Sequence, residues 1–148
     1  MLVSIINGIV NKLSEMYEEE YAIYTDFVEQ DFKEPCFYIH LVNGSNTQEL
    51  CSRYKRNYSF DIVYFPRNAN QIDELCEISE QLYLYLETIS IHNGLITGSG
   101  MNHHIEDGVL HFLVDYKPMV MVVQEEQDKM EILEWNGEVK DGTRKESK

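Results

Sequence analysis

The sequence predicts an α+β domain in which two helices pack on one face of a mainly antiparallel sheet. Two stretches carry apolar residues at helical spacing, and runs of β-branched and aromatic residues lie between and after them. Their order is helix, several strands, helix, several strands, unlike the strict alternation of a parallel α/β fold. We expect one domain over residues 1–135 and a disordered polar tail over residues 136–148, whose only large apolar residue is Val139.

The first helix is predicted over residues 2–17, where apolar residues recur every three or four positions. The acidic residues 18–20 would be unfavourable at the negative C-terminal end of this helix, so we expect it to stop near Tyr17. A short strand is expected within residues 21–32, where the apolar pattern is mixed.

Two longer strands should follow the first helix. Residues 36–42 are a dense run of β-formers, predicted as a strand with both faces mostly covered that ends in a turn at residues 43–46. Residues 54–65 alternate in polarity over their second half, and Pro66 should end that strand.

The second helix is predicted from an N-cap at Asn70, with an apolar stripe from Ile72 to Ile89 over about five turns. Residues 91–105 contain three glycines and are expected to be a strand that frays into a loop. Asp107 and Gly108 predict a hairpin turn into a strand over residues 109–116. A strand over residues 119–123 and a short strand or helix over residues 130–135 should complete the domain.

Composition excludes several classes of protein. The 12 basic and 26 acidic residues give a net charge of −14, which argues against a general binder of nucleic acid or anionic lipid. The longest purely apolar run covers residues 119–123, far short of the roughly 18 to 20 residues of a membrane-spanning helix, so no membrane partner is expected. Three cysteines without a C-x-x-C pair predict reduced thiols. The first residues lack the pattern of a signal peptide, because Lys12 interrupts their apolar stretch, so we expect the chain to stay in the cytoplasm.

Candidate catalytic and cofactor sites are weak. His103, His104 and His111 lie near acidic residues, but neighbours on a strand point to opposite faces, so we expect exposed loop histidines and no bound metal. The Gly98-Ser99-Gly100 run lacks the spacing of a nucleophile elbow, and no phosphate-binding loop or cofactor motif occurs. The chain is therefore not expected to be an enzyme.

One group of basic residues is a candidate for function. Its members supply a third of all basic residues and bracket one strand; they are Arg53, Lys55, Arg56 and Arg67. They would either protect an edge strand against aggregation or contact the acidic surface of an identical subunit. With Tyr54, they are our candidates for a subunit interface.

Several segments together resemble the tail terminator family of phages and prophages of Gram-positive bacteria. Their order and spacing match from about residue 2 to residue 135, and no single segment is diagnostic. They are Pro35-Cys36-Phe37-Tyr38-Ile39, Arg53-Tyr54-x-Arg56, Phe60-Asp61-Ile62-x-Tyr64-Phe65-Pro66 and Asp107-Gly108-Val109-Leu110-His111-Phe112-x-Val114-x-Tyr116.

The resemblance implies a non-enzymatic virion protein that assembles into a ring, typically a hexamer, on the end of the tail tube. Such a ring stops tube polymerisation and provides the surface for head-tail joining, so its partners are itself, the tail tube protein and the head-tail connector. It would assemble in the bacterial host cytoplasm and then remain in the virion tail. DNA would only pass through the lumen, and an acidic wall would let it slide.

Residues 94–107 are a candidate flexible arm that orders on contact with a neighbouring subunit, because they contain Gly94, Gly98 and Gly100 next to His103 and His104. Two functions of other classes remain open. The acidic chain could mimic DNA and inhibit a host DNA-binding protein, or it could be a small metal-dependent hydrolase that uses His103, His104 and His111.

Overall fold

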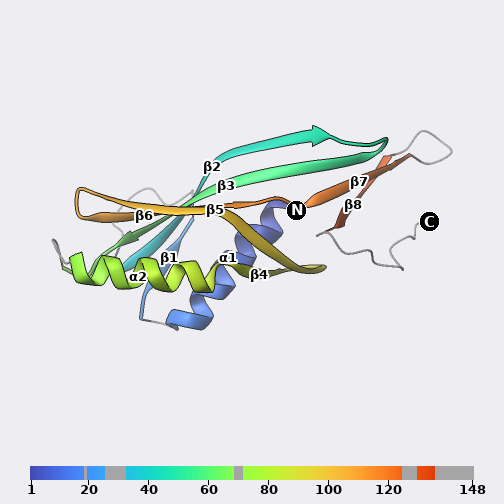
Figure 1. The fold of residues 1–148 in the computed structure, drawn as a ribbon. Helices are drawn as coiled ribbons and strands as arrows, with labels where there is room; N and C mark the ends of the chain where they lie inside the picture. Colours follow the sequence, from blue (N-terminus) through green and yellow to red (C-terminus); the bar gives the residue numbers. More distant parts are fainter. Residues whose placement is uncertain (19, 26–32, 69–71, 125–129, 136–148) are drawn as a thin grey trace.

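The computed structural model describes residues 1–18, 20–25, 33–68, 72–124 and 130–135. Figure 1 shows two helices beside a long, curved sheet. The helices are α1 (Leu2–Tyr17) and α2 (Ile72–Tyr85), and the strands are β1 (Ala22–Tyr24), β2 (Cys36–Gln48), β3 (Arg53–Phe65), β4 (Thr88–Ile91), β5 (Gly94–Glu106), β6 (Val109–Tyr116), β7 (Met119–Gln124) and β8 (Met130–Trp135).

The sheet is mostly antiparallel and follows the order β1-β2-β3-β6-β5-β4. Only β1 and β2 pair in parallel; every other described strand pair is antiparallel. Strand β7 pairs with the first residues of β3, and β8 pairs with β7. The α+β class with a mainly antiparallel sheet is confirmed, whereas the packing of both helices on one face of it stays a prediction.

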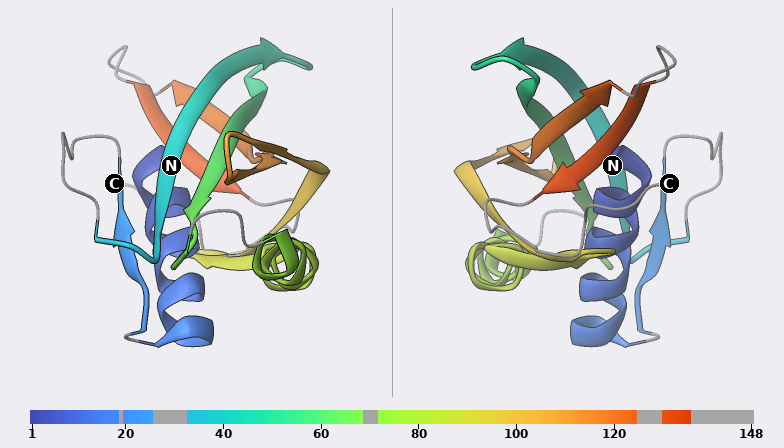
Figure 2. Two further views of the ribbon diagram at one scale, coloured as in Figure 1. Left: turned by 90° about the vertical axis from the view of Figure 1, so that its left-hand side faces the viewer. Right: turned by 90° about the vertical axis from the view of Figure 1, so that its right-hand side faces the viewer.

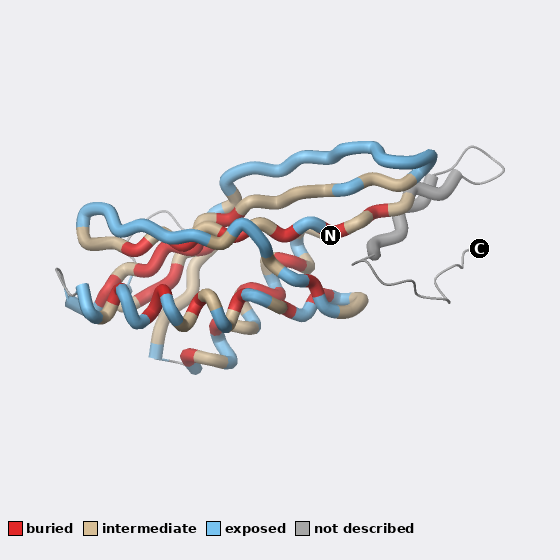
Figure 3. Tube along the Cα trace, viewed as in Figure 1, coloured by how far each residue is buried: buried red, intermediate tan, exposed pale blue. Residues whose placement is uncertain are grey.

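The core forms where alternate residues of the strands meet the apolar stripes of the helices. Strand β6 shows the alternation most clearly, because Leu110, Phe112, Val114 and Tyr116 are buried while the residues between them are half-buried. The remaining fully buried residues of this cluster include Ile5, Ile9 and Leu13 of α1, Leu75 and Leu82 of α2, and Phe37, Phe60, Ile62 and Tyr64 of β2 and β3. Figure 3 shows these buried segments where the helices approach the strands.

Helix α1 begins and ends as predicted, and Glu18 leaves the helix with a φ of 54°. It lies so close to β4 that a Cβ atom at Gly8 would come within 2.4 Å of the backbone oxygen of Ser90. Glycine at this position therefore sets how closely the helix packs on that strand.

The turn predicted at residues 43–46 is wrong, because β2 continues through Gln48. These residues pair with β3, as in Ser45 with Asn57, after a register shift between Leu41 and Asn43. The chain instead turns at residues 49–52, where Cys51 adopts a φ of 51° and the Glu49 amide donates to the Arg53 carbonyl over 2.8 Å. Residues 36–42 are mostly covered as predicted, with His40 and Val42 as the exposed positions.

Helix α2 is shorter than predicted, because it ends at Tyr85 and Ile89 belongs to β4. The apolar spacing continues beyond the helix since Leu86 and Ile89 are buried in the same core from a turn and a strand. A buried carbonyl in this turn is satisfied by Tyr116, whose hydroxyl donates to the Leu86 oxygen over 2.6 Å. The predicted cap Asn70 lies outside the described residues.

The loop predicted within residues 91–105 is also wrong, because β5 is a strand of 13 residues. Residues 94–97 pair with β4, and the strand changes partner at Gly98, from which it pairs with β6. A register shift between Ser99 and Asn102 interrupts the pairing with β6. The hairpin at Asp107 and Gly108 is confirmed, and both residues have positive φ. Strands at 54–65, 109–116 and 119–123 are confirmed within one residue at either end, and residues 130–135 are a strand.

Part of the short strand predicted within residues 21–32 is β1, and residues 26–32 lie outside the described part of the chain. The predicted tail over residues 136–148 also lies outside it.

Candidate interaction surface

The outer ends of β2 and β3 project from the body of the domain, away from α2 (Figures 1 and 2). We call residues 43–58 the distal hairpin. Every residue from 42 to 52 is exposed, and the hydrophobic core cluster contains none of residues 42–57. Backbone pairing between the two strands continues along this part of the chain.

The distal hairpin carries four of the five predicted interface residues, three of them basic, in an otherwise acidic protein. Arg53, Lys55 and Arg56 lie on the β3 side, and Glu49 is the only acidic residue between positions 43 and 58. Lys55 is exposed, whereas the Arg56 guanidinium Nε donates to the Asn46 side chain over 3.1 Å. The result is a local positive charge on a protein with a net charge of −14.

One edge of the distal hairpin is open within the described part of the structure. Strand β1 covers only the first three residues of β2, and no described strand pairs with the outer edge of β2 between residues 42 and 48. Such an edge presents backbone donors and acceptors that another chain can pair with. Residues 43–46 have the composition of a turn, but residues 43–48 pair with residues 54–59 of β3 and remain extended.

The opposite edge of the hairpin is covered by β7. Arg53, Tyr54 and Lys55 pair with residues 119–121, and the Arg56 amide donates to the Pro118 carbonyl over 3.0 Å. Strand β8 then extends this part of the sheet further (Figure 2). Tyr54 is half-buried between Gln48 and Val120, its partners on the neighbouring strands.

Arg67 does not join the other basic residues. It follows the far end of β3, and the strand from Arg56 to Phe65 alone spans roughly 30 Å. The backbone amide of Arg67 donates to the Glu74 carboxylate over 3.2 Å, and the Tyr64 hydroxyl donates to the same carboxylate oxygen. Burial, the hydrogen bond to Glu74 and its negative charge raise the pKa of Tyr64, so this hydroxyl stays protonated.

The candidate arm residues lie within β5. Gly94 is its first residue, Gly98 packs against Val114 and the Leu86 carbonyl, and Gly100 has a φ of 60° in the irregular region of the strand. A role for this segment on contact with a neighbouring subunit stays a prediction.

The prediction that the histidines lie in a loop is wrong, because His103 and His104 belong to β5 and His111 to β6. Neighbouring histidines point to opposite faces, as expected of a strand. The His103 ring nitrogen Nδ1 lies 2.8 Å from the Tyr83 hydroxyl of α2, while His104 is paired with His111 of β6 and approaches Glu106. His103 therefore lies apart from His104 and His111, Glu106 lies beside His104, and Asp61 of β3, which is distant in sequence, contacts His111.

The family model for the phage tail terminator protein matches residues 4–129. The chain belongs to this family. No curated protein matches the sequence.

Membership in the terminator family gives the chain a structural role in the phage tail, among proteins that are not enzymes. Its place is the virion tail, where it interacts with other tail and head-tail proteins of the particle. No helix in the described residues is long and apolar enough to cross a membrane.

Proposed function

We propose that this terminator assembles into a closed ring, most simply a hexamer, on the end of the tail tube. The ring stops tube polymerisation and offers its other side to the head-tail connector. The distal hairpin is the observation that carries this proposal, because it projects from the sheet, its residues 43–52 are exposed, and its residues 43–57 lie outside the hydrophobic core cluster.

A ring needs a heterologous interface, in which one patch of a subunit meets a different patch of the next. The open edge of β2 can supply one patch through backbone hydrogen bonds to a neighbouring chain. Arg53, Lys55 and Arg56 can direct that contact toward an acidic surface, which a subunit with a charge of −14 offers over much of the rest of its sequence. Charge complementarity then favours contact between unlike patches over contact between two distal hairpins.

Capping follows from such a geometry. One side of the ring binds the last ring of tube subunits, and its other side does not repeat the surface that tube subunits recognise. Tube subunits therefore cannot add to that side of the ring, and the head-tail connector binds there instead. Acidic residues along the lumen would weaken the attraction of passing DNA, because like charges remove the counterion release that drives phosphate binding.

The test measures tail tube length in the presence of purified terminator. Tube protein is polymerised with the wild-type chain or with a Lys55→Glu/Arg56→Glu variant, and tube lengths are measured by negative-stain microscopy while mass photometry follows the oligomer. We expect short, blunt tubes with the wild type. The variant should leave tubes as long as those formed without terminator.

A matched control is Lys33→Glu/Arg67→Glu, which changes the net charge equally at exposed residues outside the distal hairpin. We expect this control to shorten tubes as the wild type does, with both variants giving wild-type circular dichroism spectra. Equal capping by both variants would show that the distal hairpin is not the subunit interface. A wild-type chain that stays monomeric and leaves tube length unchanged would overturn capping itself and favour an acidic mimic that binds a host protein.

A further inference from the structure

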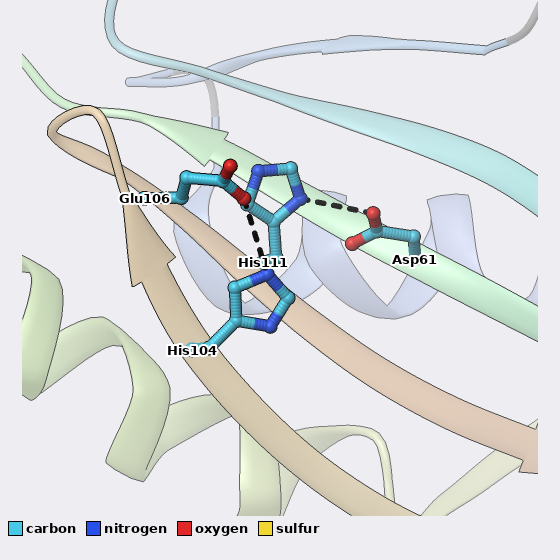
Figure 4. A network of polar contacts seen from close by, with 4 residues as sticks. All are labelled: Asp61, His104, Glu106 and His111. Carbon is cyan, nitrogen blue, oxygen red and sulfur yellow. Dashed lines mark hydrogen bonds and ion pairs between the residues drawn. The ribbon is translucent and has the colours of Figure 1, made fainter.

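A second group of polar residues lies on the sheet, on the hairpin formed by β5 and β6 (Figure 4). His104 and His111 are direct cross-strand partners, and their rings stack with centroids 4.9 Å apart and planes only 8° from parallel. Glu106 follows His104 by two residues and so shares its face of the strand. One ligand atom from each of these three residues lies within 4.8 Å of the other two.

The His111 ring is held in position by a carboxylate on its other side. Its Nδ1 lies 2.9 Å from Oδ2 of Asp61 on β3, and Figure 4 shows Asp61 and Glu106 on opposite sides of the ring. An ionised carboxylate only accepts hydrogen bonds, so Nδ1 carries the hydrogen and Nε2 keeps its lone pair. A carboxylate on one ring nitrogen is the usual support for a histidine that binds metal through the other.

Asp61 itself adds a second observation. Its other oxygen, Oδ1, is buried and has no hydrogen-bond partner among the described residues, which is costly for a carboxylate. The Asp61 carboxylate therefore places negative charge beside His111. No described hydrogen bond to Oδ1 compensates for that charge. A cation bound to Nε2 of His111 would compensate that charge.

We propose that His104, Glu106 and His111 bind a divalent transition-metal ion of the Zn²⁺ type, with Asp61 as the positioning residue for His111. Two imidazoles and one carboxylate are ligands that Zn²⁺ accepts, whereas Mg²⁺ and Ca²⁺ prefer oxygen ligands alone. Three protein ligands leave a position for water.

Closing the site requires the exposed side chains to rotate. Metal–ligand distances of about 2.0–2.1 Å in tetrahedral geometry place ligand atoms roughly 3.3 Å apart, so the present separations must shorten. The His104 and Glu106 side chains are 52% and 67% exposed and can rotate, while His111, at 25%, is the ligand already fixed by Asp61. Glu106 and His104 already approach each other, with Oε1 and Nε2 3.7 Å apart.

Isothermal titration calorimetry with ZnCl₂ tests the site on the full-length chain. Cys51 and Cys76 are exposed thiols that also attract Zn²⁺, so every protein compared carries Cys51→Ser and Cys76→Ser. We expect one Zn²⁺ per chain and no comparable binding of Mg²⁺. His104→Ala should abolish the saturable binding, and Asp61→Asn should weaken it about 10–100-fold while all three ligands remain.

The matched control is His103→Ala, which removes the neighbouring histidine on the opposite face of β5 and should leave Zn²⁺ affinity unchanged. His104 and His103 are both on the surface of the sheet, so we expect both variants to keep the wild-type circular dichroism spectrum. Absence of stoichiometric Zn²⁺ binding, or binding that survives His104→Ala combined with Glu106→Gln, would overturn the proposal. Tube capping is measured without added Zn²⁺, so failure here is distinguishable from failure of the ring.

Discussion

The two halves of the β2–β3 hairpin share the same strands and the same antiparallel pairing, yet they are stabilised differently. In the inner half, Phe37 and Tyr64 are fully buried, and the two rings pack against each other with centroids 5.0 Å apart. In the distal hairpin, the cross-strand partners Thr47 and Lys55 are both exposed. One half is part of the hydrophobic core, and the other extends beyond it.

This contrast shows how one supersecondary structure can serve two purposes. Apolar side chains on alternate positions anchor the inner half to the helices, so it contributes to the stability of the domain. The distal half adds backbone hydrogen bonds but little buried apolar surface, so its residues are available for contacts with other chains. In the proposed ring, folding and assembly would depend on different ends of the same pair of strands.

The largest difference between the two halves should appear in the free energy of unfolding. Phe37→Ala removes a ring that contacts Tyr17, Tyr21 and Tyr64, and should cost about 3–5 kcal/mol. Thr47→Ala, on the exposed distal half of the same strand, should change stability by less than about 0.5 kcal/mol. Urea unfolding monitored by circular dichroism measures both, and similar losses in the two variants would contradict the division.

Cysteines at the two ends of β2 provide a second contrast. Cys36 is fully buried, and burial together with the charge of Glu34 raises the pKa of its thiol to about 11, while Cys51 in the distal turn is exposed. At pH 8, iodoacetamide should modify Cys51 and Cys76 and leave Cys36 unmodified, as counted by mass spectrometry. Unfolding in urea should expose all three, whereas a third label on the folded chain would show that the inner half opens readily.

The same pKa shift determines the sign of a pH effect. The folded thiol of Cys36 holds its proton above the ordinary value of 9.0, so its contribution to stability is complete below pH 9 and is lost as the pH rises toward about 11. Buried Tyr116, whose pKa is also raised, acts in the same direction at still higher pH. Chemical unfolding at pH 8 and pH 11 should therefore show lower stability at the higher pH.

The smallest effect is expected from Asn46→Ala. This change removes the exposed hydrogen bond between the Asn46 side chain and the Arg56 guanidinium, so stability should fall by no more than about 0.5 kcal/mol. In the variant, Asn46 no longer holds the Arg56 side chain in position. If Arg56 also contacts a neighbouring subunit in the ring, the variant should reduce tube capping more than it reduces stability. A loss of several kcal/mol in urea unfolding would show that the distal hairpin is structurally essential.

Local patterns in the sequence determined most of the secondary structure. The apolar stripe of residues 2–17 sufficed for α1, the alternation that includes Tyr58, Phe60 and Ile62 for β3, and Asp107-Gly108 for the hairpin into β6. Each of these signals lies within a few residues of its own element, because helix periodicity, strand alternation and turn φ angles are local properties. Family resemblance came from the same segments and was confirmed over residues 4–129.

Only the tertiary structure decided where these elements end and which side chains meet. Residues 43–46 have turn composition, yet pairing with β3 keeps them extended, and the glycines of β5 lie in a strand because β4 and β6 pair with it. The meeting of His104, Glu106 and His111 with Asp61 depends on the register of three strands, and a shift of one residue would turn His104 to the opposite face. Register is fixed by contacts between residues distant in the chain, so no local pattern could specify it.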